Sequence, residues 1–188
     1  MPGKNAPSWA NGGTILPFSH ASFGVEFAGM NPAILLFGTF TIGFATGLRA
    51  FTPIALLSWV AVWGWIPLGG SRLAFLGTIT GAVITSFLAI GELIGDKLPF
   101  TPSRLAPGPL GGRILTAALA ATAFSLGTGQ PWMLGLVSGA IGSVSGAFAG
   151  FHARQFLVRR ARLRDWIIAV VEDLVTIGLV LLVLALLF

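Results

Sequence analysis

Six long apolar stretches, separated by short polar breaks, follow a polar beginning in this sequence. They are Asn31–Leu48, Thr52–Leu68, Arg72–Gly95, Leu110–Gly127, Trp132–Val158 and Trp166–Phe188. A helix needs about 20 apolar residues to cross a membrane, within a range of about 17 to 25. The third, fifth and sixth stretches meet that length easily. The other three are marginal and predict either tilted spanning helices or re-entrant segments that the protein itself covers.

Composition supports a membrane protein. Of 188 residues, 55% are hydrophobic and 9% are charged, and the mean hydropathy is +0.89. A soluble domain carries roughly a quarter charged residues. The sequence has no cysteine, which excludes disulfides and thiolate chemistry. We therefore expect an all-α integral membrane protein of about six transmembrane segments in a compact, glycine-rich bundle.

The polar beginning, residues 1–30, is rich in Gly, Pro, Asn and Ser and lacks the apolar core of a signal peptide. We expect it to form an extramembrane arm before a transmembrane domain over 31–188. That domain divides into a first half (31–95), a cytoplasmic connector (96–109) and a second half (110–188).

The two halves raise the question of a 3+3 inverted repeat, which is common among transporters. A shift of 80 residues aligns Gly47 with Gly127 and Ser58 with Ser138. The third pair of segments breaks this register, because the last apolar run begins only at Trp166. Both a duplication and a chance similarity of composition are consistent with the sequence.

The distribution of Lys and Arg predicts the orientation. In a six-span arrangement one side of the membrane collects nine of these residues and the other only Lys4 and Arg72, so the richer side is cytoplasmic. We expect an inner-membrane, multi-pass protein with both termini outside the cytoplasm. The nine are Arg49, Lys97, Arg104, Arg113, Arg154, Arg159, Arg160, Arg162 and Arg164. Their place at the ends of apolar segments suits anionic headgroups, and we expect no nucleic-acid binding despite the net charge of +5.

Glycines recur at intervals of three and four residues in several stretches, as in "GFATG", "GTITG", "GELIG" and "GLVSGAIGSVSGAFAG". Such small-residue patterns let helix backbones approach closely. We expect the third and fifth segments to form the centre of the bundle. Besides the lipid bilayer, the glycine-rich helices suggest a homo-oligomer or a membrane-protein partner.

Four carboxylates lie within or beside apolar segments. Glu92 and Asp96 are four residues apart on one helix face, and Glu172 and Asp173 lie about two turns inside the sixth segment. Arg49 ends the first segment at a comparable depth. A carboxylate in a spanning segment costs about 2.5 to 3.5 kcal/mol, so it is retained when it is paired or hydrated.

These residues support two interpretations. In one, Glu92, Asp96, Glu172 and Asp173 bind an ion or a proton, while Arg49 or Lys97 competes for them. In the other, the same cations only neutralise the acids and hold three helices together. No Ser/His/Asp order, phosphate-binding loop or metal-ligand spacing predicts an enzyme, and the sequence leaves any cofactor unknown.

Three motifs, "GLRAFTP", "GELIGDKLP" and "VVEDLV", occur in the order typical of one group of proteins. At these motifs the chain resembles the bacterial multi-pass membrane proteins known as domain-of-unknown-function family 4126, over about residues 31–188. The resemblance implies that Arg49, Glu92, Asp96, Lys97, Glu172 and Asp173 coincide with the family pattern. It implies no activity, because the family has none established.

"ELIGDKL" is also similar to the Glu-x-Gly-Asp-Lys/Arg-Ser/Thr motif of cation/proton exchangers. It has one extra residue before Gly95, and Leu98 replaces the hydroxyl residue. Together these patterns predict transport or permeation of an ion or small solute through the carboxylate and arginine cluster. The alternative is an accessory or assembly subunit of a membrane complex.

Overall fold

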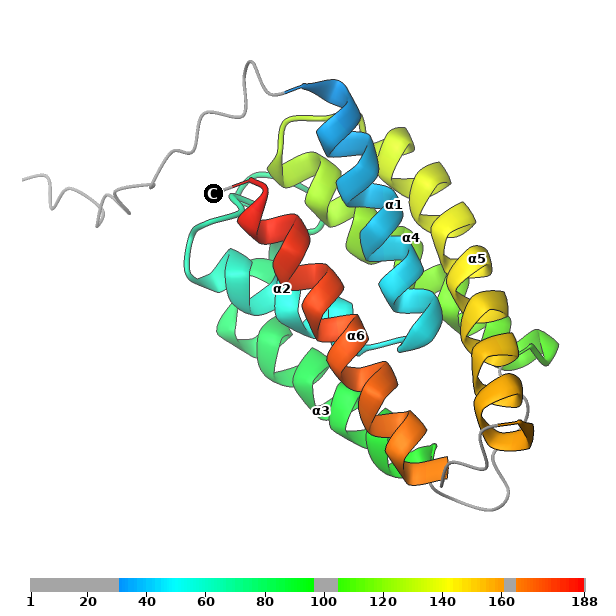
Figure 1. Ribbon diagram of the computed structural model, residues 1–188. Helices are drawn as coiled ribbons and strands as arrows, with labels where there is room; N and C mark the ends of the chain where they lie inside the picture. Colours follow the sequence, from blue (N-terminus) through cyan, green and yellow to red (C-terminus); the bar gives the residue numbers. More distant parts are fainter. Residues whose placement is uncertain (1–30, 97–104, 161–164, 188) are drawn as a thin grey trace, which may run out of the picture.

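The computed structural model describes residues 31–96, 105–160 and 165–187, and every regular element in these ranges is helical. Six α-helices and one short 3-10 helix, η1, follow one another along the chain (Figure 1). They are α1 (Pro32–Leu48), α2 (Thr52–Val62), η1 (Ala74–Gly77), α3 (Ile79–Gly95), α4 (Pro107–Gly127), α5 (Trp132–Arg159) and α6 (Asp165–Ala185). The extramembrane N-terminal segment predicted over 1–30 lies outside the described residues.

Local sequence explains where α1 begins and ends and where α2 begins. The Asn31 side chain accepts a hydrogen bond from the backbone N–H of Ala33 at 2.9 Å, and Pro32 occupies the first turn. Arg49 then leaves the helix with extended backbone angles, φ −136° and ψ 116°. A new helix starts at Thr52, with Pro53 in its first turn. A break of three residues, 49–51, therefore separates two helices within one apolar region.

The second predicted segment is too long. α2 ends at Val62, and residues 63–78 contain only the short helix η1. Gly64 and Gly70 adopt positive φ angles of 81° and 79°, a region that favours glycine. α3 begins only at Ile79, because the Thr78 hydroxyl caps it by accepting from the Gly81 N–H at 3.1 Å. The third segment therefore forms a helix of 17 residues, which is shorter than predicted.

Three helices in the described ranges are long and apolar enough to cross a membrane, judged by length and composition: α4, α5 and residues 166–185 of α6. The fourth segment, predicted to be marginal, is lengthened to 21 residues because Pro107 starts the helix three residues before the apolar run. α1, α2 and α3 are shorter apolar helices. The number of complete spans and the inverted repeat stay predictions.

The centre of the bundle is formed by α1, α4 and α5, not by α3 and α5 as predicted. α1 packs most extensively on α5, followed by α4 on α5 and α1 on α4. A Cβ atom added to Gly43 would lie 2.3 Å from the carbonyl oxygen of Gly139, and one added to Gly146 would lie 2.1 Å from that of Phe44. These glycines bring the two backbones into contact.

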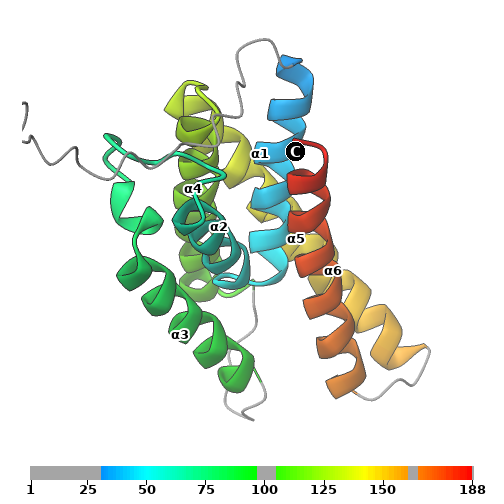
Figure 2. The ribbon, with the colours of Figure 1, turned by 90° about the vertical axis from the view of Figure 1, so that its left-hand side faces the viewer.

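α3 lies at the edge of the molecule, where it packs against α2 and η1. Figures 1 and 2 both show it beside α2 and on the far side from α5. The pattern of glycines in α3 resembles that of α5, but a Cβ added to Gly91 or Gly95 would meet nothing within 4 Å. The glycine pattern therefore could not distinguish a central helix from a peripheral one.

α6 runs along the bundle in the opposite direction to α5, so its last turns lie at the same end as the start of α1 (Figures 1 and 2). The three-residue break after α1 lies against the first half of α6, where Arg49 contacts Ala169 and Asp173. This arrangement brings the ends of several helices together at one level of the bundle.

Candidate functional site

Arg49 joins α1 to two other helices. Its side chain is 1% exposed, and its Nε atom lies 2.6 Å from Oδ1 of Asp173 on α6. One terminal nitrogen contacts Oδ2 of Asp96, the residue directly after α3. The other donates to the backbone carbonyl of Ala169 at 3.2 Å. A single buried guanidinium therefore contacts carboxylates from two helices that come from different halves of the sequence.

Glu92 is held by the beginning of α2. Its Oε1 atom accepts from the backbone N–H of Ala50 at 2.7 Å, and its Oε2 atom accepts from that of Phe51 at 2.9 Å. Oε1 also lies 3.3 Å from a terminal nitrogen of Arg113. Both carboxylate oxygens are thus bound by donors at fixed positions of the backbone or of a buried arginine.

Arg113, on α4, is bound to the end of α1. It is 6% exposed, and its NH1 atom donates to the carbonyl oxygens of Gly47 at 3.1 Å and Leu48 at 2.8 Å. These carbonyls belong to the last turn of α1, which has no further helical N–H groups to bond them. Arg113 therefore terminates α1 and pairs with Glu92 at the same time.

The charges of Glu92 and Arg113 match the two helix ends that meet at the break. A helix carries partial negative charge at its C-terminus and partial positive charge at its N-terminus. Arg113 lies at the C-terminal end of α1, and Glu92 lies at the N-terminal end of α2. Each such interaction contributes about 0.3 to 1 kcal/mol, and up to about 2 kcal/mol in partly buried positions. This pair therefore stabilises a break in an apolar region.

Glu172 faces a different helix from its neighbour Asp173. Its Oε2 atom lies 3.6 Å from NH1 of Arg154 on α5. Successive side chains on a helix point roughly 100° apart, so adjacent carboxylates on α6 reach α5 and α1 separately. Thr176, one turn later, donates to the carbonyl oxygen of Glu172 at 2.8 Å. The four carboxylates thus divide among three arginines.

The predicted site residues that the structure describes all take part in this cluster. They are Arg49, Glu92, Asp96, Glu172 and Asp173. Lys97, the sixth, lies outside the described residues. Sequence reasoning missed Arg113 and Arg154, which it counted only toward orientation. The signal was present for Arg113, since it is an isolated charge inside the fourth apolar stretch.

The carboxylates differ in exposure. The side chains of Asp173 and Asp96 are 26% and 17% exposed, while those of Glu92 and Glu172 are 9% and 10% exposed. The two aspartates that share Arg49 are therefore less covered by protein than the two glutamates.

Exposed tryptophans lie at the starts of α5 and α6, at opposite ends of the bundle, and the cluster lies between these two levels. Trp166 starts α6 and Trp132 starts α5, and both are more than half exposed. At 1.5 Å per residue, Asp173 lies about 10 Å along α6 from Trp166. Ala147, whose backbone lies against Gly47, lies about 22 Å along α5 from Trp132. The sum is close to the roughly 30 Å of a bilayer core, which would place the cluster inside it near one face.

The regular elements of the described ranges are all helices, and three of them are long and apolar enough to cross a membrane, as expected of a membrane protein. Residues 36–186 match the model of the family described as "Domain of unknown function (DUF4126)". The chain belongs to this family, which confirms the resemblance inferred from its motifs.

A second comparison links the chain to a transporter. It is 30% identical over 118 residues to the Na(+)/H(+) antiporter NhaA of Paramagnetospirillum magneticum. The match covers 59% of this chain and 30% of the antiporter, so the chain spans less than a third of that relative. No solved structure matches the chain significantly.

Proposed function

We propose that this protein transports a small cation in exchange for protons, and that Asp96 and Asp173 alternately bind the two. The observation that carries the proposal is the placement of Arg49 between these two carboxylates. The similarity to a sodium/proton antiporter supports the same class of substrate.

The charge of this group favours a single positive ligand. Arg49 contributes one positive charge and the two aspartates contribute two negative charges, which leaves a net charge of −1. A net charge inside a bilayer is costly, because the hydrocarbon core solvates ions poorly. One proton or one monovalent cation would restore neutrality, and the two would then compete for the same place.

The number of carboxylates also bears on the ligand. Calcium takes about six to eight oxygen ligands, and magnesium requires near-octahedral coordination. No group of three or more acidic or histidine side chains within the described ranges is arranged to hold a metal ion. Two aspartates with an arginine between them are better suited to a proton or a weakly held monovalent cation.

Glu92 and Glu172 take a supporting role in this proposal. Glu92 is bound through both oxygens, to Ala50, Phe51 and Arg113, and its release would leave the start of α2 without a partner. Glu172 pairs with Arg154. We infer that these two acids hold α2, α4, α5 and α6 in place around the exchanging aspartates.

The proposed location is the inner membrane, with the cluster on the cytoplasmic side and both termini outside. The excess of Lys and Arg supports this orientation: nine of these residues fall on one side and two on the other. Under this orientation Asp96 and Asp173 take up protons from the cytoplasm.

Flux in proteoliposomes tests the proposal. The purified protein is expected to move protons when a sodium or potassium gradient is imposed, reported by a pH-sensitive dye. Asp96→Asn and Asp173→Asn should each abolish cation-dependent movement. Gly178→Ala is the control, since it changes α6 at a position with nothing within 4 Å of an added Cβ. Cation-independent dye signals, or full activity of both variants, would contradict the proposal.

Glu172→Gln separates the roles of adjacent acids. It removes one carboxylate from α6, as Asp173→Asn does, but it affects the contact with Arg154 rather than that with Arg49. We expect it to lower the yield of folded protein while the cation concentration for half-maximal flux stays unchanged. A changed half-maximal concentration would assign Glu172 to the cation site itself.

A second candidate function is that of an accessory subunit, as the exposed side of α3 suggests. Gly91 and Gly95 have nothing within 4 Å of an added Cβ, and Phe87 and Ile94 are 69% and 60% exposed. A helix of a partner protein could approach this face closely. Purification with a stoichiometric partner, together with no flux from the protein alone, would favour this function.

A further inference from the structure

We propose that residues 52–96, from α2 to the end of α3, move as one arm against a core of α1, α4, α5 and α6, and that the Asp96–Arg49 contact latches the arm shut. The use of this movement in transport rests on the proposed function. The movement itself is argued from packing and is measured without any flux.

The helices of the core pack against one another more closely than α3 packs against any of them. Within the core, α1 and α5 touch through their backbones at Gly43 and Gly146, and α4 packs against both helices. α3 packs against α2 and η1, and no comparable packing joins it to a core helix within the described ranges. α6 packs mainly on α1 and so belongs with this core. α2 packs on α4, α6 and α1, on each less extensively than on α3, and α3 depends on the rest of the arm for its position.

Ion pairs connect the free end of α3 to the core. Asp96 contacts Arg49, and Glu92 lies 3.3 Å from Arg113. The other two bonds of Glu92 go to Ala50 and Phe51 at the break, where the arm begins. Ion pairs resist separation only while both partners keep their charge. An ion that takes the place of Arg49 at Asp96 would remove one of the two ion pairs at this end of α3 and leave its attachment to the core weaker.

The opposite end of the arm is tightly packed. The side chain of Ile66 lies so close to α4 that a Cβ added to Gly127 would be 2.1 Å from its Cγ2 atom. Ile66 and Leu68 are buried there. This contact fixes the arm to α4 at the end far from the ion pairs, and it is suited to act as a pivot.

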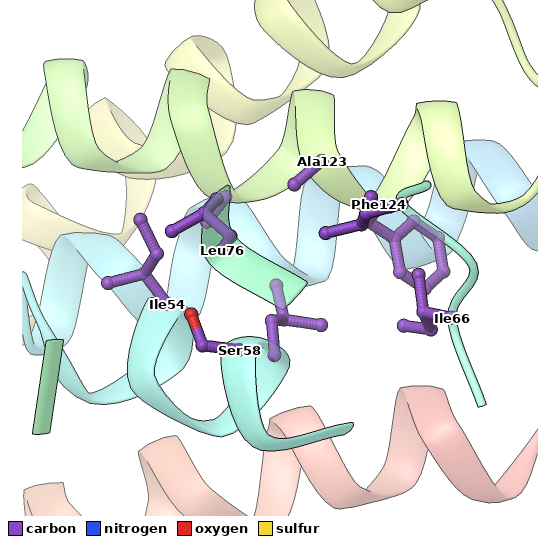
Figure 3. A pocket seen from close by; sticks show the side chains of 9 residues that line it. Ile54, Ser58, Ile66, Leu76, Ala123 and Phe124 are labelled. Atoms are coloured by element: carbon purple, nitrogen blue, oxygen red, sulfur yellow. The ribbon is translucent and has the colours of Figure 1, made fainter. Parts of the chain in front are cut away.

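A small cavity lies beside the pivot, and Ile66 and Leu68 form part of its wall. Its walls come from the arm on one side and from α4 on the other, as Figure 3 shows for Ile54, Leu76 and Phe124. Its volume is about 10 Å³, roughly the least space that holds one water molecule. The Oγ atom of Ser58 points into this space and has no hydrogen-bond partner among the described residues. A void and an unpaired hydroxyl weaken the contact between arm and core.

Distance measurements between spin labels test the latch. The chain has no natural cysteine, so labels can be placed at Ile94→Cys on α3 and Leu174→Cys on α6, both more than half exposed. A second pair, at Phe37→Cys on α1 and Val137→Cys on α5, reports on the core.

Two variants that each remove one carboxylate from Arg49 distinguish latch release from general damage. Asp96→Asn should add a longer-distance population to the pair between α3 and α6, and should leave the core pair unchanged. Asp173→Asn, which keeps the Asp96–Arg49 contact, should leave the pair between α3 and α6 at its native distance. Identical distances in the native protein and the folded Asp96→Asn variant would overturn the proposal.

Thiol accessibility gives a second measurement that needs no change in the ionic cluster. Ser58→Cys places a thiol between arm and core, and Ser143→Cys places one in α5 within the core. Both serines are fully buried with an unpartnered Oγ among the described residues. N-ethylmaleimide should modify position 58 at least about tenfold faster, which corresponds to a difference of about 1.4 kcal/mol in opening free energy. Equal rates would overturn the proposal.

Discussion

The contact between α1 and α5 fixes the position of Arg49, and Gly146→Ala tests how close that contact is. A Cβ atom at position 146 would lie 2.1 Å from the carbonyl oxygen of Phe44 and 2.9 Å from its carbonyl carbon. An ordinary contact between such atoms is about 3.5 to 4.0 Å. The backbones must therefore separate by more than 1 Å, because no flexible side chain lies between them.

Such overpacking typically costs about 1 to 3 kcal/mol. For a chain of this length, 1 kcal/mol shifts the unfolding temperature by roughly 2 to 4 °C. We expect Gly146→Ala to lower the unfolding temperature in detergent by about 2 to 12 °C, measured by the loss of monodisperse protein on heating. The separation would also displace Arg49, so cation-dependent flux should fall with stability.

Gly178→Ala is the matched control for this substitution. It makes the same change in a helix at a position with nothing within 4 Å of the new Cβ. Alanine favours a helix over glycine by about 1 kcal/mol, so this variant should unfold at the native temperature or slightly above it. Equal unfolding temperatures for the two variants would refute the close approach of α1 and α5.

Three further outcomes follow from the structure. Glu92→Gln replaces an acceptor oxygen with an N–H₂ group beside Arg113 and the start of α2, so thermal unfolding should show a loss of about 1 to 3 kcal/mol; an unchanged unfolding temperature would contradict the assigned contacts. Ser86→Ala removes the hydroxyl that accepts from the Trp59 indole at 3.0 Å, and denaturation should show a loss of about 1 kcal/mol, with no loss if that bond is unimportant. A reporter enzyme fused after Phe188 should be active outside the cytoplasm, and cytoplasmic activity would disprove the proposed orientation.

The sequence predicted the charged residues better than it predicted the packing. Arg49, Glu92, Asp96, Glu172 and Asp173 stood out because charges are rare in apolar segments, and the structure brings them to one level of the bundle. The six-span arrangement assumed from the sequence was sufficient to predict that they lie at similar depths. The partners of each acid depended on helix rotation, which a sequence pattern alone does not give.

Helix boundaries and neighbours were less predictable. The run from Trp63 to Leu68 is apolar because Ile66 and Leu68 pack on α4, although the segment is not helical. Gly64 and Pro67 were local signals of this ending. The glycines of α3 and α5 share a spacing, and only tertiary contacts show that those of α5 face another backbone.

Arg113 is a residue of the ionic cluster that sequence reasoning explained in another way. Its charge was counted only toward the predicted cytoplasmic excess of Lys and Arg. In the structure it bonds Gly47 and Leu48 and pairs with Glu92. These contacts could be recognised only from the structure, which places the end of α1 and the last turn of α3 beside Arg113.

Proton release on cation binding tests the central claim most directly. Purified protein in a weakly buffered detergent solution is mixed with sodium, potassium or choline chloride, and the pH change is recorded. If a proton and a monovalent cation compete for Asp96 and Asp173, sodium or potassium should release protons and choline should not, and Asp96→Asn and Asp173→Asn should each abolish the release. Release that persists in both variants, or no release from the native protein, would contradict the account.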